Sequence, residues 1–454
     1  MQKPTLPKGT RDFGPVQMAK RNFILDTIKE TFRLFGYEQL ETPAMENLNT
    51  LTGKYGDEGD QLIFKILNSG DFLKKVTPQD FQEGASATLS KVAEKGLRYD
   101  LTVPFARYVV MNRHELTFPF KRFQIQPVWR ADRPQKGRYR EFYQCDADVI
   151  GTDSLLCEAE IILMIRRVFE KLGIQDYSIK LNNRKVLTGI AEVIGEAGKE
   201  GPLCVAIDKL DKIGREKVEE ELLERGFGPA AIQKLAPLFE SNAESISEVL
   251  IFLEDFLQVS EIGLQGVKEL QEMLQLLNSL GADQEHLVLD FLLARGLSYY
   301  TGAIFEVKAH GVQIGSVSGG GRYDDLTGVF GMPNMSGVGF SFGVDRIYDV
   351  MEELGLFPDQ TLTGSQILLA HFDEKAYGYA LGVLSKLRAQ GIRAEVYPDL
   401  NKMKKQLDYA SKKGIPFVAI CGDDEIKNET IAFKNLETGE QEFMKVEEAI
   451  NRLI

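Results

Sequence analysis

The stretch that most constrains the fold of this chain covers residues 294–324 and is rich in glycine, arginine and tyrosine. Three consecutive glycines, 319–321, weaken a strand and are retained mainly where a backbone must bend or let something approach closely. Tyr299 and Tyr300 would point to opposite faces of a strand, so one can pack while the other presents its hydroxyl to a ligand. We interpret the stretch as the wall of a binding site. A hairpin with bulge glycines is the alternative.

Size and composition indicate a globular protein of several domains. The chain has 454 residues, of which 43% are hydrophobic and 27% charged. This length exceeds a single core, and about two to four domains are expected. No apolar run approaches the roughly 18 residues that cross a bilayer, and the N-terminus has no apolar signal segment. We therefore expect a cytoplasmic protein that does not bind a membrane. The net charge of −13 argues against nonspecific coating of nucleic acid but allows a localised basic surface.

Cysteine and histidine do not predict a metal centre. Both residue types are scattered and match no metal-ligand spacing, at Cys145, Cys157, Cys204, Cys421, His114, His286, His310 and His371. We therefore expect reduced thiols and no metal bound by protein side chains.

The first part of the chain predicts one long helix and a pair of long strands. Residues 17–35 carry an apolar stripe at helical spacing, which Gly36 can end. Residues 37–42 are typical of a strand. Two further strands within residues 120–151 flank a polar loop that carries five basic residues, namely Arg130, Arg133, Lys136, Arg138 and Arg140.

Polar side chains occur here where packing would favour apolar ones. Arg130 follows Trp129, the single tryptophan, so we expect it to emerge from packed surroundings and not from a solvated loop. On the returning strand Gln144, Asp146 and Asp148 share one face. These positions predict a polar pocket instead of a core.

Two more segments offer groups for binding charged ligands. Asp100 and Thr102 would share a face of a strand, where a carboxylate beside a hydroxyl suits an ammonium group; a surface strand end is the alternative. Residues 337–351 indicate a strand, a glycine and a helix. Arg346 lies near that helix N-terminus, where N–H groups and the dipole favour an anion.

Three arginines come from separate glycine-rich or loop segments, at Arg130, Arg295 and Arg346. Arginines that converge on phosphates can stabilise a phosphoryl transition state without a protein nucleophile. The sequence has no Walker loop, no Rossmann glycine pattern after a strand and no Ser-His-Asp arrangement.

The remaining chain predicts a helical segment and a separate small domain. Helical periodicity without candidate chemistry covers residues 185–282, which we interpret as an insertion. After a linker at 358–364, strands and helices alternate as in a small α/β domain with a largely parallel sheet. A helix predicted over 401–413 is either a solvated face or a phosphate contact, with lysines at Lys402, Lys404, Lys405, Lys412 and Lys413.

These motifs together resemble the histidyl-tRNA synthetase family over nearly the whole chain. Residues 295–302, Arg-Gly-Leu-Ser-Tyr-Tyr-Thr-Gly, and residues 319–324, Gly-Gly-Gly-Arg-Tyr-Asp, are similar to its two histidine-specific signatures. One departure is Ser298, where the family usually has aspartate.

The class II aminoacyl-tRNA synthetase motifs also have counterparts. Segments 17–43, 129–140 and 339–346 resemble the first, second and third class II motifs. Segments 97–104 and 144–148 look like the eukaryotic and archaeal-type branch of the family.

The resemblance implies an ATP site. Arg130 would bind the α-phosphate and the histidine carboxylate, and Arg346 would hold the γ-phosphate and stack on adenine. Arg138 and Gly343 would also contact ATP. Arg295 would stabilise the transition state at the α-phosphate, which makes it, with Arg130, the catalytic pair.

The resemblance also implies a histidine site. Asp100, Thr102 and Gln144 would bind the ammonium group. The rest of the substrate would be surrounded by Asp148, Tyr299, Tyr300 and Tyr323. A pocket that hydrogen-bonds both ring nitrogens can reject apolar competitors by roughly 10⁴ or more, because its polar groups would be left unpaired.

The implied partners are the tRNA for histidine, L-histidine, ATP with Mg²⁺, and a second copy of the chain in a homodimer. The acceptor end of the tRNA would meet Gln135, Lys136 and Arg138. The C-terminal domain would read the anticodon, with phosphate contacts from Lys402, Lys404 and Lys405.

The implied fold is α+β: a class II antiparallel-sheet catalytic domain with a helical insertion, followed by a small α/β anticodon-binding domain. The expected boundaries are 1–184 and 283–357 for the catalytic domain, 185–282 for the insertion and 365–454 for the last domain. The expected function is ATP-dependent attachment of histidine to its tRNA through a histidyl-adenylate. A non-catalytic paralogue that senses histidine or tRNA is the alternative.

Overall fold

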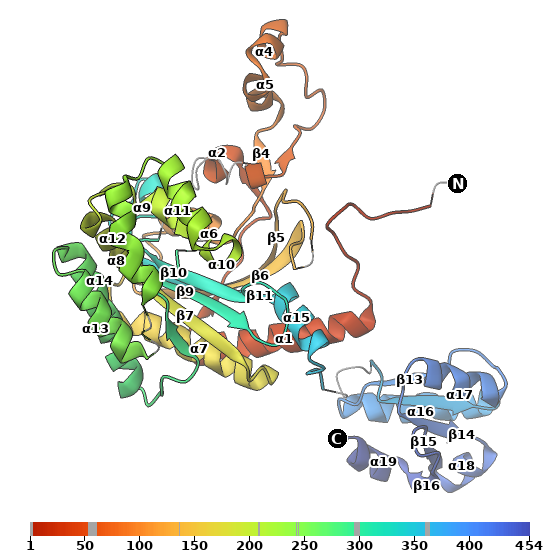
Figure 1. Ribbon diagram of the computed structural model, residues 1–454. Coiled ribbons are helices and arrows are strands. Elements are labelled where there is room, and N and C mark those ends of the chain that lie inside the picture. Colours follow the sequence, from red (N-terminus) through yellow and green to blue (C-terminus); the bar gives the residue numbers. More distant parts are fainter. Residues whose placement is uncertain are drawn as a thin grey trace. The chain divides into compact units, whose positions relative to one another are not determined.

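The computed structural model describes residues 3–52, 61–135, 137–207, 209–241, 243, 245–294, 300–358 and 364–454. The chain divides into two compact units (Figure 1). The larger unit comprises Met1–Asp12 and Phe23–Leu356, and the smaller comprises Phe13–Asn22 and Phe357–Ile454.

The larger unit is built on a mixed, mostly antiparallel sheet. Among the described residues it has eight strands, in the order β1-β5-β6-β11-β10-β9-β7-β8. Only the outermost pairs, β1 with β5 and β7 with β8, are parallel. The strand bounds in that order are Glu38–Gln39, Phe120–Trp129, Glu141–Ile150, Gly337–Gly343, Ser318–Tyr323, Ala303–Ala309, Tyr177–Asn183 and Leu287–Leu289.

Helix α1, Pro15–Leu34, packs its apolar stripe on this sheet as the sequence predicts. Ile24, Ile28 and Phe32 are fully buried, and the ring of Phe32 lies 5.5 Å from that of Phe123 on β5. The helix ends at Leu34, and the chain turns away at Gly36, whose φ of 79° is a left-handed conformation that glycine adopts without strain. The predicted strand after it is short, since only β1 pairs.

Helices cover the sheet and form the insertion (Figure 1). Helix α7, Leu156–Leu172, packs against β11 and α14. The segment between β7 and β8 is helical, as predicted, with bounds α8 Arg184–Val193, α9 Glu200–Ile207, α10 Leu210–Ile213, α11 Arg215–Glu224, α12 Pro229–Glu240, α13 Ile246–Phe256 and α14 Glu261–Ser279. The remaining elements of this unit are β2 Met45–Asn47, α2 Leu48–Leu51, β3 Lys65–Ile66, α4 Pro78–Glu83, α5 Ala85–Val92, β4 Lys95–Leu97, α6 Thr102–Met111, η1 Gly328–Phe330 and α15 Val344–Glu353.

The triple glycine lies in β10, between β9 and β11, and no bulge interrupts its pairing with β11. β9 and β10 do form a hairpin, as in the alternative interpretation, but the glycines pair in continuous register and are not bulges. A Cβ on Gly320 would lie 2.1 Å from the carbonyl oxygen of Gly339, and a Cβ on Gly321 would lie 2.9 Å from the ring of Tyr300. The glycines are needed because backbone and side chains approach this strand closely.

A buried ion pair ties β10 to α7. The guanidinium of Arg322 donates to both carboxylate oxygens of Glu158, at 2.5 and 2.8 Å, and to the hydroxyl of Ser336 at 2.6 Å. Arg322 also donates to the backbone carbonyls of Thr152 and Ser154. Glu158 is fully buried, so this arginine is the positive charge that balances it inside the protein.

The smaller unit is the α/β domain that the sequence predicts. Its sheet has the order β13-β12-β14-β15-β16, with β12, β13 and β14 parallel and the last two strands antiparallel. Apolar clusters fill both faces of the sheet. The element bounds are β12 Ile367–His371, α16 Glu374–Ala389, β13 Ala394–Val396, α17 Met403–Lys412, β14 Phe417–Cys421, α18 Asp423–Asn428, β15 Thr430–Asn435, β16 Gln441–Lys445 and α19 Val446–Leu453.

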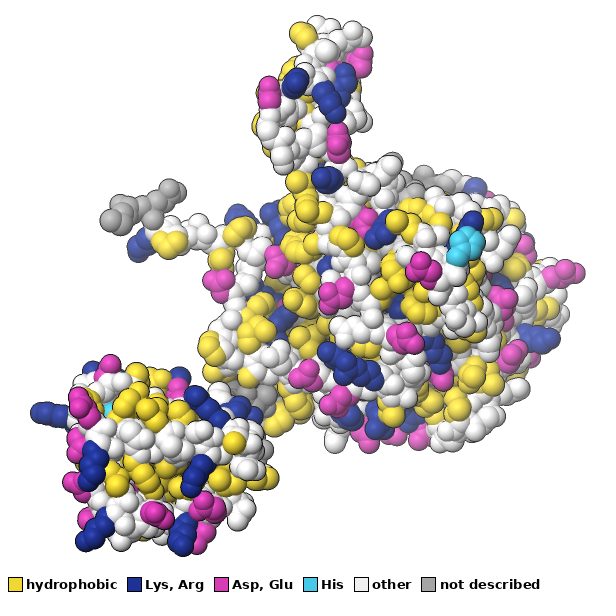
Figure 2. Space-filling model, turned by 180° about the vertical axis from the view of Figure 1, so that it is seen from behind, with side chains coloured by type: hydrophobic (Ala, Val, Ile, Leu, Met, Phe, Trp, Pro, Cys, Tyr) yellow, Lys and Arg dark blue, Asp and Glu magenta, His cyan; other side chains and the backbone are white. Residues whose placement is uncertain are grey.

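The surface mixes charges of both signs. On the face of the larger unit seen in Figure 2, basic and acidic side chains are interspersed, so the acidic excess does not gather in one visible patch there. Through the described ranges, no helix is both long and apolar enough to cross a membrane.

Candidate active site

Two adjoining cavities lie over the central strands of the larger unit. The first, of about 420 Å³, is lined by the β5–β6 loop, β10, β11 and the start of α15; we call it the arginine cavity. The second, of about 180 Å³, is lined by carboxylates, an amide and tyrosines; we call it the carboxylate cavity. Arg130, Gln144 and Tyr300 line both, so the two cavities form one continuous site.

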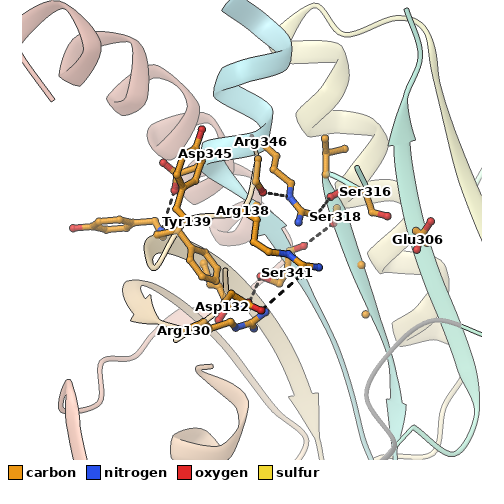
Figure 3. Close-up of a pocket in the computed structure, with 18 of the residues that line it drawn as sticks. Arg130, Asp132, Arg138, Tyr139, Glu306, Ser316, Ser318, Ser341, Asp345 and Arg346 are labelled. Carbon is orange, nitrogen blue, oxygen red and sulfur yellow. Dashed lines mark hydrogen bonds and ion pairs between the residues drawn. The ribbon is translucent and has the colours of Figure 1, made fainter. Parts of the chain in front are cut away.

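Three guanidinium groups face the arginine cavity: Arg130, Arg138 and Arg346 (Figure 3). Arg346 is held from behind, because its Nε donates to the carbonyl of Gly137 at 2.8 Å and its Nη1 to that of Ser316 at 2.6 Å. Burial lowers the pKa of Arg346, and the positive charges of Arg138 and Arg130 lower it further. Positive charges that repel one another in a cavity favour a polyanionic ligand.

Arg130 is oriented at the boundary of the two cavities. Its Nε donates to the carbonyl of Tyr99 at 2.9 Å, and its guanidinium carbon lies 5.2 Å from the ring centre of Phe142. These contacts leave the guanidinium facing both cavities. Gly343, at the end of β11, also lines the arginine cavity, and Arg138 lies 3.7 Å from Asp132 across the loop.

The carboxylate cavity gathers six of the residues assigned to histidine, namely Asp100, Thr102, Gln144, Asp148, Tyr300 and Tyr323. Tyr323 donates to Oδ1 of Asp148 at 2.8 Å, and Arg122 lies 2.8 Å from Oδ2 of the same carboxylate. Burial raises the pKa of Asp148, while the Arg122 charge and the Tyr323 hydrogen bond act in the opposite direction. Burial, and then the charge of Asp148, keep the pKa of Tyr323 well above its usual value.

The local structure predicted for Asp100 and Thr102 is wrong. Strand β4 ends at Leu97, and Thr102 is the first residue of α6, so the two do not alternate on a strand. Asp100 instead accepts a hydrogen bond from the backbone N–H of Val103 at 3.4 Å. Pro104 is tolerated in the first turn of the helix, because a backbone N–H at that position would have no hydrogen-bond partner within the helix. Both side chains nevertheless line the carboxylate cavity.

Some assigned residues lie outside the described part of the chain: Lys136, Arg295, Ser298 and Tyr299. Gln135 and Arg138 are exposed and bridge one another in the β5–β6 loop. In the smaller unit, Lys402, Lys404 and Lys405 are exposed at the start of α17.

Sequence reasoning missed residues of the site. These are Arg122 behind the carboxylate cavity, Ser341 on its wall and Glu306 in the arginine cavity. Asp146 was predicted to lie on the polar face of its strand but was given no ligand, and it lines the carboxylate cavity. The hairpin register offered a signal, because Arg122, Gln124 and Gln126 stand opposite Asp148, Asp146 and Gln144. Alternate polar residues on both strands of one hairpin indicate a polar layer rather than a core face.

An antiparallel sheet with an arginine-lined cavity beside a carboxylate pocket has the form of a class II aminoacyl-tRNA synthetase. Comparison with known proteins gives the particular family. The family described as "Histidyl-tRNA synthetase" matches residues 90–347, and the one described as "Anticodon binding domain" matches residues 365–454. The chain therefore belongs to the histidyl-tRNA synthetase family, which confirms the predicted fold class.

Curated relatives match over the whole length. A histidine–tRNA ligase from Cytophaga hutchinsonii is 58% identical over 454 residues and covers 100% of both chains. One from Phocaeicola vulgatus is 59% identical over 449 residues, 99% of this chain and 98% of its own length. The predicted eukaryotic or archaeal branch is not supported, because these close relatives are bacterial. The two short segments behind that prediction, 97–104 and 144–148, reflect local pocket chemistry and were too short to place the whole chain.

Solved structures match the fold. The histidyl-tRNA synthetase of Nostoc sp. PCC 7120 has a TM-score of 0.84 at 31% identity, covering 100% of both chains. A Bacillus halodurans protein titled as an ATP phosphoribosyltransferase regulatory subunit/histidyl-tRNA synthetase has a TM-score of 0.73 over 93% of this chain and 100% of its own. At 22% identity, the second likeness shows the fold alone.

Proposed function

We propose that the two cavities activate L-histidine with ATP as a histidyl-adenylate and that the histidyl group then passes to tRNA, with AMP as the leaving group. In the first step, a carboxylate oxygen of histidine bonds to the α-phosphorus of ATP, and pyrophosphate leaves. The observation that carries the proposal is Arg130, which faces both the arginine cavity and the carboxylate cavity. A single guanidinium there can contact the two groups that react.

The arginine cavity would hold the triphosphate. Arg130 would bind the α-phosphate, Arg346 the γ-phosphate and the adenine face, and Arg138 the phosphate tail, with Gly343 leaving room for the nucleotide. Preorganised cations in a partly buried site stabilise developing negative charge without reorganising during the reaction. Arg295 would act on the α-phosphate as the second catalytic residue, by resemblance to the family signature.

The carboxylate cavity would hold histidine. Asp100, Thr102 and Gln144 would bind the ammonium group. The imidazole would lie against Asp148, whose charge Arg122 balances, and against Tyr323, Tyr300 and Tyr299.

Mg²⁺ would be held by few protein groups. Within the described residues, no three His, Cys, Asp or Glu side chains cluster as a metal site. Mg²⁺ is usually bound by one or two carboxylates together with substrate phosphates. Glu306 fits this pattern, because it is buried, lines the arginine cavity and acts electrostatically on Arg346. The ion would neutralise charge on the phosphates.

The tRNA would contact both units. Gln135, Lys136 and Arg138 would meet its acceptor end, and the smaller unit, with Lys402, Lys404 and Lys405, its anticodon region. We further propose a homodimer in the cytoplasm, with α1 at the dimer interface by resemblance to the class II fold.

The decisive test is pyrophosphate exchange on the purified protein with each amino acid in turn. We expect exchange with ATP and histidine and background rates with proline or threonine. Binding of histidine without any exchange would instead favour the non-catalytic sensing paralogue, which the full-length ligase relatives do not favour.

The lysines of α17 give a second prediction. Replacing Lys402, Lys404 and Lys405 by alanine should weaken tRNA binding and lower the log–log salt slope by about 0.7 to 0.9 per lost phosphate contact. Exchange without tRNA should be unchanged. A matched control replaces three other exposed lysines of this unit, on α16 and α18, namely Lys375, Lys386 and Lys427. Equal losses in both triple variants would contradict a specific contact surface.

A further inference from the structure

Asp146 lies in the middle of the polar face of β6, between two residues that already have roles. Alternation places Gln144, Asp146 and Asp148 on one face, about 7 Å apart from one to the next along the strand. All three line the carboxylate cavity, and Asp146 is only 3% exposed. Asp148 is occupied by Arg122 and Tyr323. Among the described residues, the Oδ1 atom of Asp146 is buried without a hydrogen-bond donor.

The surroundings of Asp146 connect it to the ammonium end of the cavity. Ser341 of β11 stands opposite Asp146 and hydrogen-bonds to it, and the amide of Gln144 donates to the same hydroxyl at 3.4 Å. The charged groups that act on Asp146 are Arg122 from β5, Asp148 from β6 and Asp100 from the segment before α6. Asp146, Ser341 and Gln144 thus form one cluster at the end of the cavity assigned to the substrate's ammonium.

We propose that Asp146 is an additional histidine-binding residue, whose Oδ1 accepts an N–H of the substrate's ammonium group beside Gln144. This inference rests on the proposed function. An ammonium carries three donors, and a buried carboxylate oxygen without a donor is unfavourable until a ligand or a proton satisfies it. When the ammonium binds, one of its N–H donors gains an acceptor and the Asp146 oxygen gains a donor.

Binding should then move a proton. The pKa of Asp146 is raised to about 7, chiefly by burial; the charge of Arg122 opposes the rise and that of Asp148 adds to it. Near neutral pH about half of the empty sites therefore carry a proton on this carboxyl. An ammonium against the carboxyl favours its charged form, and the proton leaves to solvent. Histidine affinity should therefore fall as pH drops below about 7, over and above the titration of free histidine.

The test compares the whole protein with D146N by calorimetry, in buffers of different ionisation enthalpy. At pH 7 the wild type should release about half a proton more per histidine than the variant. At pH 8 the D146N dissociation constant should be roughly 10- to 100-fold higher, and at pH 5.5 the two should be close. The titration of histidine itself is common to both proteins and cancels in the ratio.

Two controls sharpen the comparison. D283N removes an exposed carboxylate that pairs with Arg166 and should leave proton release unchanged. With imidazole propionate, which lacks the amino group, wild type and D146N should bind alike. Equal proton release by wild type and D146N would overturn the inference. A loss of imidazole propionate binding in D146N as large as its loss of histidine binding would also overturn it.

A further variant keeps the test informative if D146N does not fold. Ser341→Ala removes a hydrogen bond that lowers the Asp146 pKa, so the pH midpoint of histidine affinity should move upward. An unmoved midpoint would overturn the inference. Absence of any histidine binding to the wild type would instead overturn the proposed function, and this inference with it.

Discussion

Arg130→Ala is expected to lower histidine-dependent pyrophosphate exchange by roughly 10³-fold, the loss typical of a guanidinium or oxyanion donor at the reacting centre. The arginine faces both cavities, so its removal takes a contact from the α-phosphate and from the substrate carboxylate at once. The loss should fall mainly on kcat, because the remaining contacts to ATP and histidine stay in place.

Two variants separate this role from general charge. Arg130→Lys keeps the positive charge but loses the planar fork and should recover only part of the activity. Arg225→Ala removes an exposed arginine that pairs with Glu221 on the insertion and should leave exchange unchanged. Exchange within a factor of two of the wild type in R130A would contradict the assigned role.

Arg322→Met is expected to lower the free energy of unfolding of the larger unit by about 3–5 kcal/mol, because it leaves Glu158 buried without its counter-charge. Trp129, the only tryptophan, lies on β5 of that unit and reports its unfolding by fluorescence in urea. Adding Glu158→Leu should recover much of the loss, since the double variant buries no unpaired charge.

The effect should depend on pH in a defined direction. Burial raises the pKa of Glu158 and Arg322 counters it, so the pKa must rise further in R322M. A carboxyl whose pKa is higher in the folded than in the unfolded state takes up protons on folding, and stability then falls as pH rises. R322M should therefore be closest to the wild type near pH 5 and furthest from it near pH 8. A destabilisation that does not vary with pH would contradict this account.

The spacing of apolar residues along the chain predicted most of the helices and strands. The stripe of 17–35, the two strands around the basic loop and the alternating elements after 365 all correspond to observed elements. Asp100 and Thr102 were placed wrongly because a four-residue apolar-polar alternation fits a strand end and a helix start equally well. The pairing of β11 with β6 and of β9 with β7 joins residues far apart in sequence, which local patterns cannot predict.

The site was only partly visible in the sequence. Arg346 and Gln144 stood out because glycine or packing residues surround them. Arg122 did not stand out, because the sequence does not distinguish a buried arginine from a solvated one. Its pairing with Asp148 on the neighbouring strand is visible only in the structure. Glu306 was hidden for the same reason, because a buried and a solvated glutamate look alike in the strand 303–309, which also carries Lys308.

The cavities draw on two stretches of chain that the insertion separates. Arg130 and Gln144 precede α8, whereas Gly319, Ser341 and Arg346 follow α14. A polypeptide that stops within the insertion, whether during synthesis on the ribosome or after proteolysis, therefore has only half of each cavity. Such fragments should not sequester nucleotide or amino acid from intact molecules, and two complementary fragments would have to associate before either ligand could bind.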